Sequence, residues 1–385
     1  MKKRIALVRG PNLNSWELQN FLPLRKTYDI VGFTSYLHNF DLNEIPLEIR
    51  KLISWGQLAW VRPARALVQT VLGDYHDLAG LRRHLAGFAI VHTAETGYYS
   101  TYQAARLKAQ LGFKLVVTVW ENIPFLRNSG QARKHKERVF RETDLFLAIS
   151  RKAREVLILE GAPAEKVVVW MPGIDTHHFR PMPKDHSLLR QFGCEPDDQI
   201  ILYVAHLYRQ KGIFDLLYAF KSALGRKGNT QLKLLIAGRG PEQRTVEETV
   251  RQLNLREVVR VIGPHPYSRM PAIHNLADVF VLGSQPTPKW QEQFGYVLVE
   301  SMACGKAVVS TLSGSIPDVV GAAGILVPPA DFSSLADTIV ALVNSPATRE
   351  SLGANGRARV EQYFDAAIAA SRLHDEYDRL VTGSP

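Results

Sequence analysis

Two acidic residues eight positions apart, Glu292 and Glu300, lie in the segment with the clearest capacity for chemistry, EQFGYVLVESMACGK. Gly295 stands between them and permits a close turn, and the apolar residues that follow it predict a helix. A helical rise of about 1.5 Å per residue would place the two carboxylates about 12 Å apart, with the free N–H groups of the helix start between them. This arrangement suits a nucleotide-linked sugar, because each carboxylate can accept hydrogen bonds from hydroxyls and the helix start can bind phosphate.

The segment resembles the E-x7-E signature of the family 4 glycosyltransferases, enzymes of the GT-B fold that use nucleotide-sugar donors. Glu292 and Glu300 match the two acids, and the turn at Phe294 and Gly295 and the following ESMACGKAVVS match closely. The resemblance implies that Glu292 binds the transferred sugar and that Glu300 binds the ribose hydroxyls. It also implies that backbone N–H groups around Phe294 and Gly295 stabilise the departing diphosphate.

A second motif, AHLYRQKGIFDLLYAF, resembles the family segment in which an arginine and a lysine hold the diphosphate. Lys211 matches the lysine, whereas His206 stands where the arginine is expected, and Arg209 is a candidate to compensate. A lysine ammonium is a suitable point-charge partner for phosphate. We therefore expect Lys211, Glu292, Arg209 and His206 to be the catalytic residues.

Glycines at strand ends complete the donor-binding candidates. Gly238 and Gly240 in the GRGP turn resemble the family's turn beside the nucleotide, and Gly263 ends the next strand, where family members commonly hold the base. Gly10, in the loop RGPNLNS, stands where the family has a glycine-rich loop next to the donor phosphates and the acceptor. The resemblance implies that the backbone approaches the ligand closely at these glycines.

The acceptor side departs further from the family pattern. The strand predicted at 114–120 ends in TVWEN, so Trp120 stands where the family commonly has a histidine close to the transferred sugar. Trp120 could stack on a sugar face while Glu121 or Asn122 supplies the polar contact, and Asn12 lies in the polar loop after the first strand. A tryptophan packed in the core at a strand end is the alternative.

Short β-branched runs alternate with helical patterns along most of the chain, which predicts a parallel α/β architecture. A polar, proline-rich passage divides these runs into two groups. The strands predicted before it are 4–8, 28–33, 88–92, 114–120, 145–149 and 167–170. The strands predicted after it are 200–205, 232–237, 258–262, 279–282, 307–310 and 325–327.

Two such groups predict two domains of the α/β class, and 385 residues exceed one usual core. The resemblance implies the GT-B arrangement, in which two doubly wound Rossmann-like domains face a central cleft. We expect an acceptor-side domain at 1–180, a linker at 181–198 and a donor-binding domain at 199–360. A last helix at 361–385 is expected to cross back toward the first domain.

Composition indicates a globular protein, with 46% hydrophobic and 22% charged residues. The two cysteines, Cys194 and Cys304, form no disulfide framework and fit a reducing compartment. The basic start MKKR precedes an apolar run too short for a secretory signal, and no run approaches the length of a membrane span. We expect a cytoplasmic protein.

The net charge of +10 is concentrated in the first part of the chain. Residues 1–180 hold 26 Lys and Arg against 16 Asp and Glu, whereas the remaining residues hold 21 of each. The stretch 44–73 mixes basic and aromatic side chains, and a basic run follows at 133–141. These features are typical either of amphipathic helices with aromatic core faces or of peripheral attachment to an anionic membrane, here the inner face. No nucleic-acid-binding module is recognised, so nucleic acid is not an expected partner.

As a whole, the resemblance implies a retaining glycosyltransferase with a UDP- or GDP-linked sugar donor and a glycan, lipid-linked or small-molecule acceptor. No D-x-D motif, HExxH motif or cysteine–histidine cluster occurs, so we expect neither a metal nor another cofactor. The P-loop pattern GxxxxGK(S/T) is absent as well, which argues against a P-loop hydrolase. A nucleotide-sugar epimerase and a catalytically inactive sugar-nucleotide-binding protein remain open as alternatives.

Overall fold

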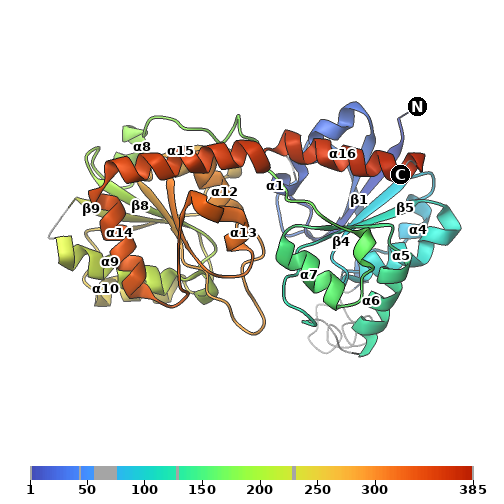
Figure 1. Cartoon of the computed structure of the whole chain (residues 1–385), viewed down its shortest axis with the longest axis horizontal. Helices are drawn as coiled ribbons and strands as arrows, with labels where there is room; N and C mark the ends of the chain where they lie inside the picture. Colours follow the sequence, from blue (N-terminus) through green and yellow to red (C-terminus); the bar gives the residue numbers. More distant parts are fainter. Residues whose placement is uncertain (1, 43–44, 56–75, 127–129, 228–230, 384–385) are drawn as a thin grey trace. The chain divides into compact units, whose positions relative to one another are not determined.

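The computed structural model describes residues 2–42, 45–55, 76–126, 130–227 and 231–383. Within this part of the chain two compact units form, each around a parallel β-sheet (Figure 1). The first unit consists of residues 1–173 together with 366–385, and the second consists of residues 174–365.

The passages between the units differ from the expected boundaries. The chain leaves the first unit after Gly173 and returns to it at Ala366. The segment 181–198, expected as a linker, belongs to the second unit and contains α8 (His186–Gln191). The side chain of Asp185 caps the start of this helix. The polar composition therefore marks a capped surface helix and not a connection between domains.

The first sheet is built, within the described residues, from seven parallel strands: β1 (Arg4–Gly10), β2 (Asp29–Ser35), β3 (Glu48–Leu52), β4 (Ile90–Ala94), β5 (Lys114–Val119), β6 (Leu145–Ala148) and β7 (Val167–Val169). Their order across the sheet is β3-β2-β1-β4-β5-β6-β7. The central strands are almost completely buried, so both faces of the sheet are covered. Parallel sheets buried in this way have continuous apolar strands, which is why the sequence predicted all of these strands except β3.

The unpredicted strand β3 lies at the edge of the first sheet, in the stretch 44–73 that we expected to form amphipathic helices. It pairs in parallel with β2. An edge strand keeps charged side chains in water, and on β3 the Nε of Arg50 lies 2.7 Å from Oε1 of Glu48. The mixture of charged and apolar residues here is thus the mark of an exposed sheet edge. Residues 56–73 of the stretch lie outside the described residues.

The described helices of the first unit connect these strands and cover the sheet: α1 (Ser15–Leu18), η1 (Leu22–Lys26), α4 (Leu81–His84), α5 (Tyr99–Leu111), α6 (Gly130–Glu142), α7 (Arg151–Leu159), η2 (Ala164–Lys166) and α16 (Ala366–Thr382). The last helix, α16, supplies part of the core of this unit. Leu373 and Tyr377 are fully buried, and Nε1 of Trp170 donates to the Ala369 carbonyl at 2.9 Å. Burial of side chains of this size contributes roughly 1.5–3 kcal/mol each.

The basic run 133–141 lies on α6, and part of it is engaged within the unit. Lys136 is 6% exposed, and its Nζ lies 2.7 Å from Oε2 of Glu160. Arg133 pairs with Glu137 one helical turn away at 3.2 Å. Fewer cations of α6 are therefore available to an external anionic surface than the sequence suggested.

The second sheet is built, within the described residues, from six parallel strands: β8 (Gln199–Val204), β9 (Leu232–Ala237), β10 (Val259–Gly263), β11 (Val279–Leu282), β12 (Ala307–Thr311) and β13 (Ile325–Val327). Their order is β10-β9-β8-β11-β12-β13. Each corresponds to a predicted strand, with small differences at the ends. The prediction of two parallel α/β domains is confirmed.

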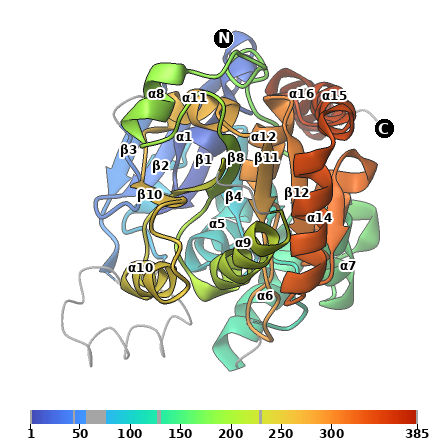
Figure 2. The same cartoon turned by 90° about the vertical axis from the view of Figure 1, so that its left-hand side faces the viewer.

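The helices of the second unit, besides α8, are η3 (Arg209–Lys211), α9 (Ile213–Lys227), α10 (Gln243–Gln252), η4 (Tyr267–Arg269), α11 (Met270–Asn275), α12 (Tyr296–Ala303), α13 (Ile316–Val320), η5 (Gly321–Ala323), α14 (Phe332–Asn344) and α15 (Pro346–Tyr363). Figure 2 shows α9 and α14 side by side against the sheet, where they pack on each other. Among the described helices of the chain, none has the length and apolar character to cross a membrane.

In each sheet the strand order reverses at one place. It does so between β1 and β4 in the first sheet and between β8 and β11 in the second. Connections run to opposite sides from such a switch point, so the loops after the two strands part and leave room for a ligand at their carboxyl ends. The residues to examine are therefore those that follow β1, β4, β8 and β11.

Candidate functional site

The loops after β8 and β11 are joined backbone to backbone. Gln285 N–H donates to the Gln210 carbonyl at 2.7 Å. Gly212 has a φ of +72° and lies so close to Gly283 that a Cβ at Gly212 would overlap the Gly283 carbonyl group. Only glycine fits such a position. The contact brings Lys211 to the end of β11.

Lys211 and Glu292 form an ion pair at this switch point. Nζ of Lys211 lies 2.7 Å from Oε2 of Glu292, and the same oxygen accepts the hydroxyl of Ser284 at 2.7 Å. Glu292 is 6% exposed, and a carboxylate this buried requires a charged or hydrogen-bonding partner. Two predicted catalytic residues that stand 81 positions apart are thus in direct contact. Ser284, to which the sequence assigned no role, completes the arrangement.

The backbone of Glu292 is held as firmly as its side chain. Its carbonyl accepts the N–H of Ser315 at 2.9 Å. Gly314 has a φ of +56°, and a Cβ there would overlap that same carbonyl. The carboxylate of Glu292 is therefore fixed with respect to both neighbouring loops.

The segment 285–291 forms a short turn that places Trp290 against Lys211. Thr287 N–H donates to the Trp290 carbonyl at 2.6 Å. Nζ of Lys211 lies 4.9 Å from the centroid of the Trp290 ring, within the range of a cation–π interaction. Lys211 is thus held by a carboxylate and by an aromatic face.

The other two predicted catalytic residues have no such contact with Glu292. The Nε of Arg209 pairs with Glu242 at 3.2 Å, and its guanidinium lies 4.8 Å from the centroid of the Phe214 ring. His206 is exposed, and its ring lies 6.3 Å from that of Tyr208. Of the three basic side chains predicted to be catalytic, Lys211 is therefore the one that contacts Glu292 among the described residues.

The turn before α12 is built as the sequence predicted, but its aromatic residue has a packing role. Gly295 has a φ of +83° and precedes the first residue of the helix. Phe294 is 2% exposed and packs against Phe364 with ring centroids 5.8 Å apart. Glu300, on the second turn of α12, is 4% exposed, and its Oε2 lies 3.2 Å from Nε2 of His274. His274 has no counterpart among the predicted site residues.

The glycines of the GRGP turn are required by backbone packing. A Cβ at Gly238 would overlap the Ala205 carbonyl, and one at Gly240 would overlap the backbone of Leu207. This turn is thereby locked to the loop after β8. Gly263, at the end of β10, has open space where a Cβ would stand.

In the first unit, Gly10 and Asn12 lie at the end of β1, at the other switch point. Gly10 has a φ of +54°, and a Cβ there would lie 3.9 Å from the His76 side chain. The Asn12 amide donates to the Tyr98 hydroxyl at 3.4 Å, and its oxygen accepts the Asn39 amide at 2.9 Å. Asn12 is thus oriented by residues from other loops of the same unit.

Of the candidates at the end of β5, Glu121 and Asn122 serve mainly their own loop. Glu121 Oε1 accepts the N–H groups of Asn122 and Ile123 at 3.1 and 3.0 Å, and Asn122 is fully buried. Trp120 is half-buried, and its backbone N–H donates to Oε1 of Glu95 at 2.9 Å. Glu95 has the left-handed φ of 60°, which is uncommon for this residue type and concentrates at functional sites. The sequence did not mark Glu95 as a candidate site residue. Its contact with Trp120 and its left-handed backbone are seen only in the folded structure.

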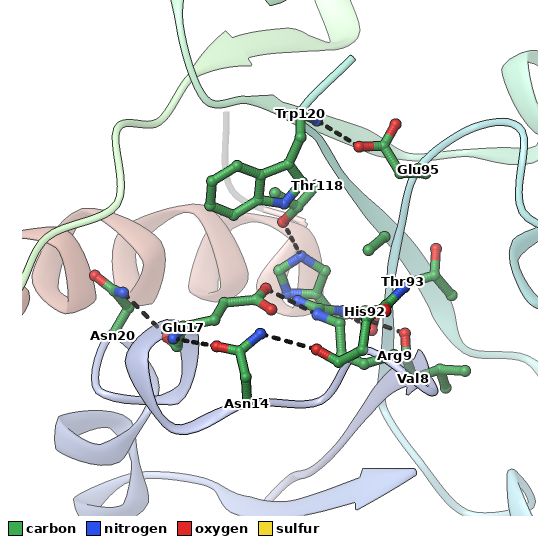
Figure 3. A network of polar contacts seen from close by, with 12 residues as sticks. Val8, Arg9, Asn14, Glu17, Asn20, His92, Thr93, Glu95, Thr118 and Trp120 are labelled. Carbon is green, nitrogen blue, oxygen red and sulfur yellow. Dashed lines mark hydrogen bonds and ion pairs between the residues drawn. The ribbon is translucent and has the colours of Figure 1, made fainter. Parts of the chain in front are cut away.

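A buried polar network also lies at this switch point (Figure 3). Arg9 is 3% exposed, with its Nε 2.8 Å from Oε1 of Glu17 and its Nη1 2.9 Å from the His92 carbonyl. His92 contacts the Thr118 hydroxyl through Nε2 at 2.6 Å and the Tyr377 hydroxyl through Nδ1 at 2.5 Å. The network connects β1, β4 and β5 with α16.

The surroundings of His92 favour its neutral form. Burial, and then the charge of Arg9, lower the pKa of His92 well below its usual value. The neutral imidazole donates from one nitrogen and accepts at the other, which suits a hydroxyl on each side. The network thus ties together the ends of β1 and β5, where Gly10 and Trp120 lie. A charged residue near the end of an otherwise apolar strand, as Arg9 is in β1, is the sequence signal of the network.

Two family models match the chain. The model of the glycosyl transferases group 1 matches residues 187–359, and that of Glycosyltransferase Family 4 matches residues 56–178. The chain is 26% identical over 362 residues to the D-inositol 3-phosphate glycosyltransferase of Corynebacterium jeikeium, covering 84% of each protein. It is 32% identical over 203 residues to the capsular polysaccharide biosynthesis glycosyltransferase CapM of Staphylococcus aureus, covering 52% of this chain and 50% of that protein.

Solved structures share the fold over essentially the whole chain. Sucrose-phosphate synthase from Thermosynechococcus elongatus has a TM-score of 0.80 at 22% identity and covers 100% of both chains. Anabaena HepE in complex with UDP has a TM-score of 0.79 at 18% identity and covers 98% of this chain and 99% of that one. At these identities the likeness is one of fold.

Proposed function

The chain is a family 4 glycosyltransferase with the GT-B fold, and we propose that it is a retaining enzyme that takes its sugar from a UDP- or GDP-linked donor. The observation that carries the proposal is the Lys211–Glu292 pair, with 2.7 Å between Nζ and Oε2, at the switch point of the second sheet. A cation and a carboxylate held together at the carboxyl ends of parallel strands can bind the diphosphate and the sugar of one donor.

In the proposed reaction Lys211 stabilises the negative charge that develops on the diphosphate as its bond to the sugar C1 breaks. The acceptor hydroxyl forms its bond to C1 on the face that the diphosphate leaves, so the anomeric configuration is kept. Its proton passes to a phosphate oxygen of the leaving group. Glu292 accepts hydrogen bonds from the transferred sugar and Glu300 from the ribose.

We propose that this reaction needs no metal. The positive charge for the leaving group comes from Lys211 and from the N–H groups at the start of α12, whose helix dipole favours an anion. The left-handed conformation of Gly295 turns the chain into that helix start. Arg209 and His206, in the same loop as Lys211, are proposed as further partners of the diphosphate.

The relatives narrow the proposed substrates. UDP is bound in the Anabaena HepE structure, which supports UDP as the first nucleotide to test. The relatives include enzymes named for a D-inositol 3-phosphate acceptor and for capsular polysaccharide biosynthesis. These names support a hydroxyl-rich acceptor, either a glycan, free or lipid-linked, or a small molecule. The half-buried Trp120 is our candidate for stacking on it.

Both alternatives that the sequence left open have less support. The named relatives are glycosyltransferases and include no epimerase. A catalytically inactive binder would keep a donor-binding Lys211 and Glu292 but would show no turnover. Measurement of both binding and turnover therefore separates this reading from the proposed enzyme.

A screen of UDP- and GDP-sugars by thermal unfolding tests the proposal. A donor present at about 100 times its Kd stabilises the folded state by about 2.7 kcal/mol, which corresponds to a rise in Tm of about 5–10 °C for a unit of this size. The stabilising nucleotide sugar is then incubated with candidate acceptors, and release of UDP or GDP is measured. Absence of stabilisation by every donor would contradict the proposal, and stabilisation without turnover would indicate the inactive binder.

We also propose that the protein acts in the cytoplasm and attaches peripherally to the anionic inner face of the membrane. The support is the positive excess of residues 1–180, with 26 Lys and Arg against 16 Asp and Glu, together with the exposure of Trp55 at 61% and of Ile53 at 42%. Aromatic and basic residues together favour a membrane interface. Flotation with anionic vesicles at low salt should carry the protein upward, whereas neutral vesicles should not. Equal recovery with both kinds of vesicle would refute the attachment.

A further inference from the structure

A buried histidine lies directly against the second acid of the candidate donor site. His274 is on α11 and Glu300 is on α12, 26 positions further along the chain, and Nε2 of the ring lies 3.2 Å from Oε2 of the carboxylate. His274 is fully buried and Glu300 is 4% exposed. A contact this well shielded from water is expected to be strong, because no solvent competes for either group.

The surroundings of His274 decide which nitrogen carries the proton. Nδ1 is buried and has no hydrogen-bond partner among the residues that the structure describes. A proton on Nδ1 would therefore be buried without an acceptor, which is costly. A ring with its proton on Nε2 avoids this cost and donates that proton to the Glu300 carboxylate.

The ring of His274 is also held in place. It packs against Phe280 and Phe179, with centroid distances of 5.4 and 6.1 Å. The adjacent Asn275 ties the end of α11 to the loop at 180–182, donating to the Arg180 carbonyl and accepting the Met182 N–H, both at 2.9 Å. A donor fixed this firmly sets the orientation of the group that accepts from it.

We propose that His274 is a positioning residue for nucleotide binding. By engaging Oε2, it turns the Glu300 carboxylate so that Oε1 is presented to the vicinal hydroxyls of the donor ribose. None of the described residues hydrogen-bonds to Oε1 of Glu300, so this oxygen can accept from the ligand. The inference rests on the proposed function, in which Glu300 binds the ribose.

The test compares two nucleotides in three forms of the full-length protein. Calorimetric titration gives the Kd of UDP and of 2′,3′-dideoxy-UDP for the wild type, His274→Phe and His274→Gln, or of the corresponding guanosine compounds if the wild type binds GDP. We expect His274→Phe to weaken UDP binding about tenfold, the loss of one hydrogen bond to a charged group. The dideoxy compound should bind the wild type and His274→Phe with equal affinity. His274→Gln, whose amide N–H can replace Nε2–H, should bind UDP nearly as the wild type does.

A packing control separates this effect from general damage to the unit. Phe280→Leu removes the ring beside His274 and leaves the hydrogen bond to Glu300 in place, so it should lower Tm and keep the wild-type ratio of the two Kd values. The inference is overturned if His274→Phe weakens both nucleotides equally, or if His274→Gln binds UDP as poorly as His274→Phe. A wild type that binds neither UDP nor GDP would instead refute the proposed function.

Discussion

Replacing Lys211 by alanine should lower kcat/KM for sugar transfer by about 100-fold or more. The ammonium group forms an ion pair with Glu292 at 2.7 Å, and loss of one group that stabilises a leaving anion typically costs this much. Initial rates with the nucleotide sugar identified by the thermal screen give the measurement.

The matched control is Lys221→Ala, which removes an exposed lysine from α9 in the same unit. It should change kcat/KM by less than about twofold, as expected of a surface substitution. Glu292→Gln, which keeps the size of the side chain and removes its charge, should lose activity as Lys211→Ala does. Wild-type turnover in both Lys211→Ala and Glu292→Gln would rule out the assigned roles.

Replacing Gly212 by alanine should destabilise the second unit by more than about 3 kcal/mol and abolish donor binding. A left-handed φ costs a residue with a Cβ about 1–2 kcal/mol, and at Gly212 the Cβ would also overlap the Gly283 carbonyl group. Relief of that overlap would push apart the two loops that carry Lys211 and Ser284. Urea unfolding of the variant measures the first effect, and nucleotide titration measures the second.

Gly263→Ala provides the matched comparison in the same unit. Gly263 has a φ of +73°, against +72° at Gly212, but a Cβ there would meet nothing within 4 Å. Its substitution should cost only the backbone term, about 1–2 kcal/mol. Equal losses of stability in the two variants would show that close packing of the loops contributes nothing beyond the φ requirement.

Much of the fold could be predicted because local patterns report it directly. Buried parallel strands appear as continuous apolar runs, as β8 and β11 at the centre of the second sheet do. The exception, β3, is an edge strand whose charged side chains face water, so its pattern resembles that of an amphipathic helix. The prediction of a linker at 181–198 differs from the structure for a related reason. A capped surface helix such as α8 has the same polar composition as a connection between domains.

Some properties of the candidate site residues could likewise be predicted from the sequence, and others could not. Motif spacing predicted Lys211 and Glu292 as site residues, which the structure brings into contact, and it marked Gly295 as the turn before a helix. It could not show that Arg209 pairs with Glu242 or that Phe294 belongs to the core. Those outcomes depend on which neighbours are nearest after packing.

By itself, then, the sequence determined the α/β class, the two domains and the stretch around Glu292 that carries the family signature. Only the tertiary structure shows that Lys211 contacts Glu292 and that Gly212 packs too closely on Gly283 to carry a Cβ. It also shows that His274 lies against Glu300. The physical reason is distance along the chain. The contact of Lys211 with Glu292 spans 81 positions, and it exists because β8 and β11 are neighbours in the sheet, an arrangement that no local pattern encodes.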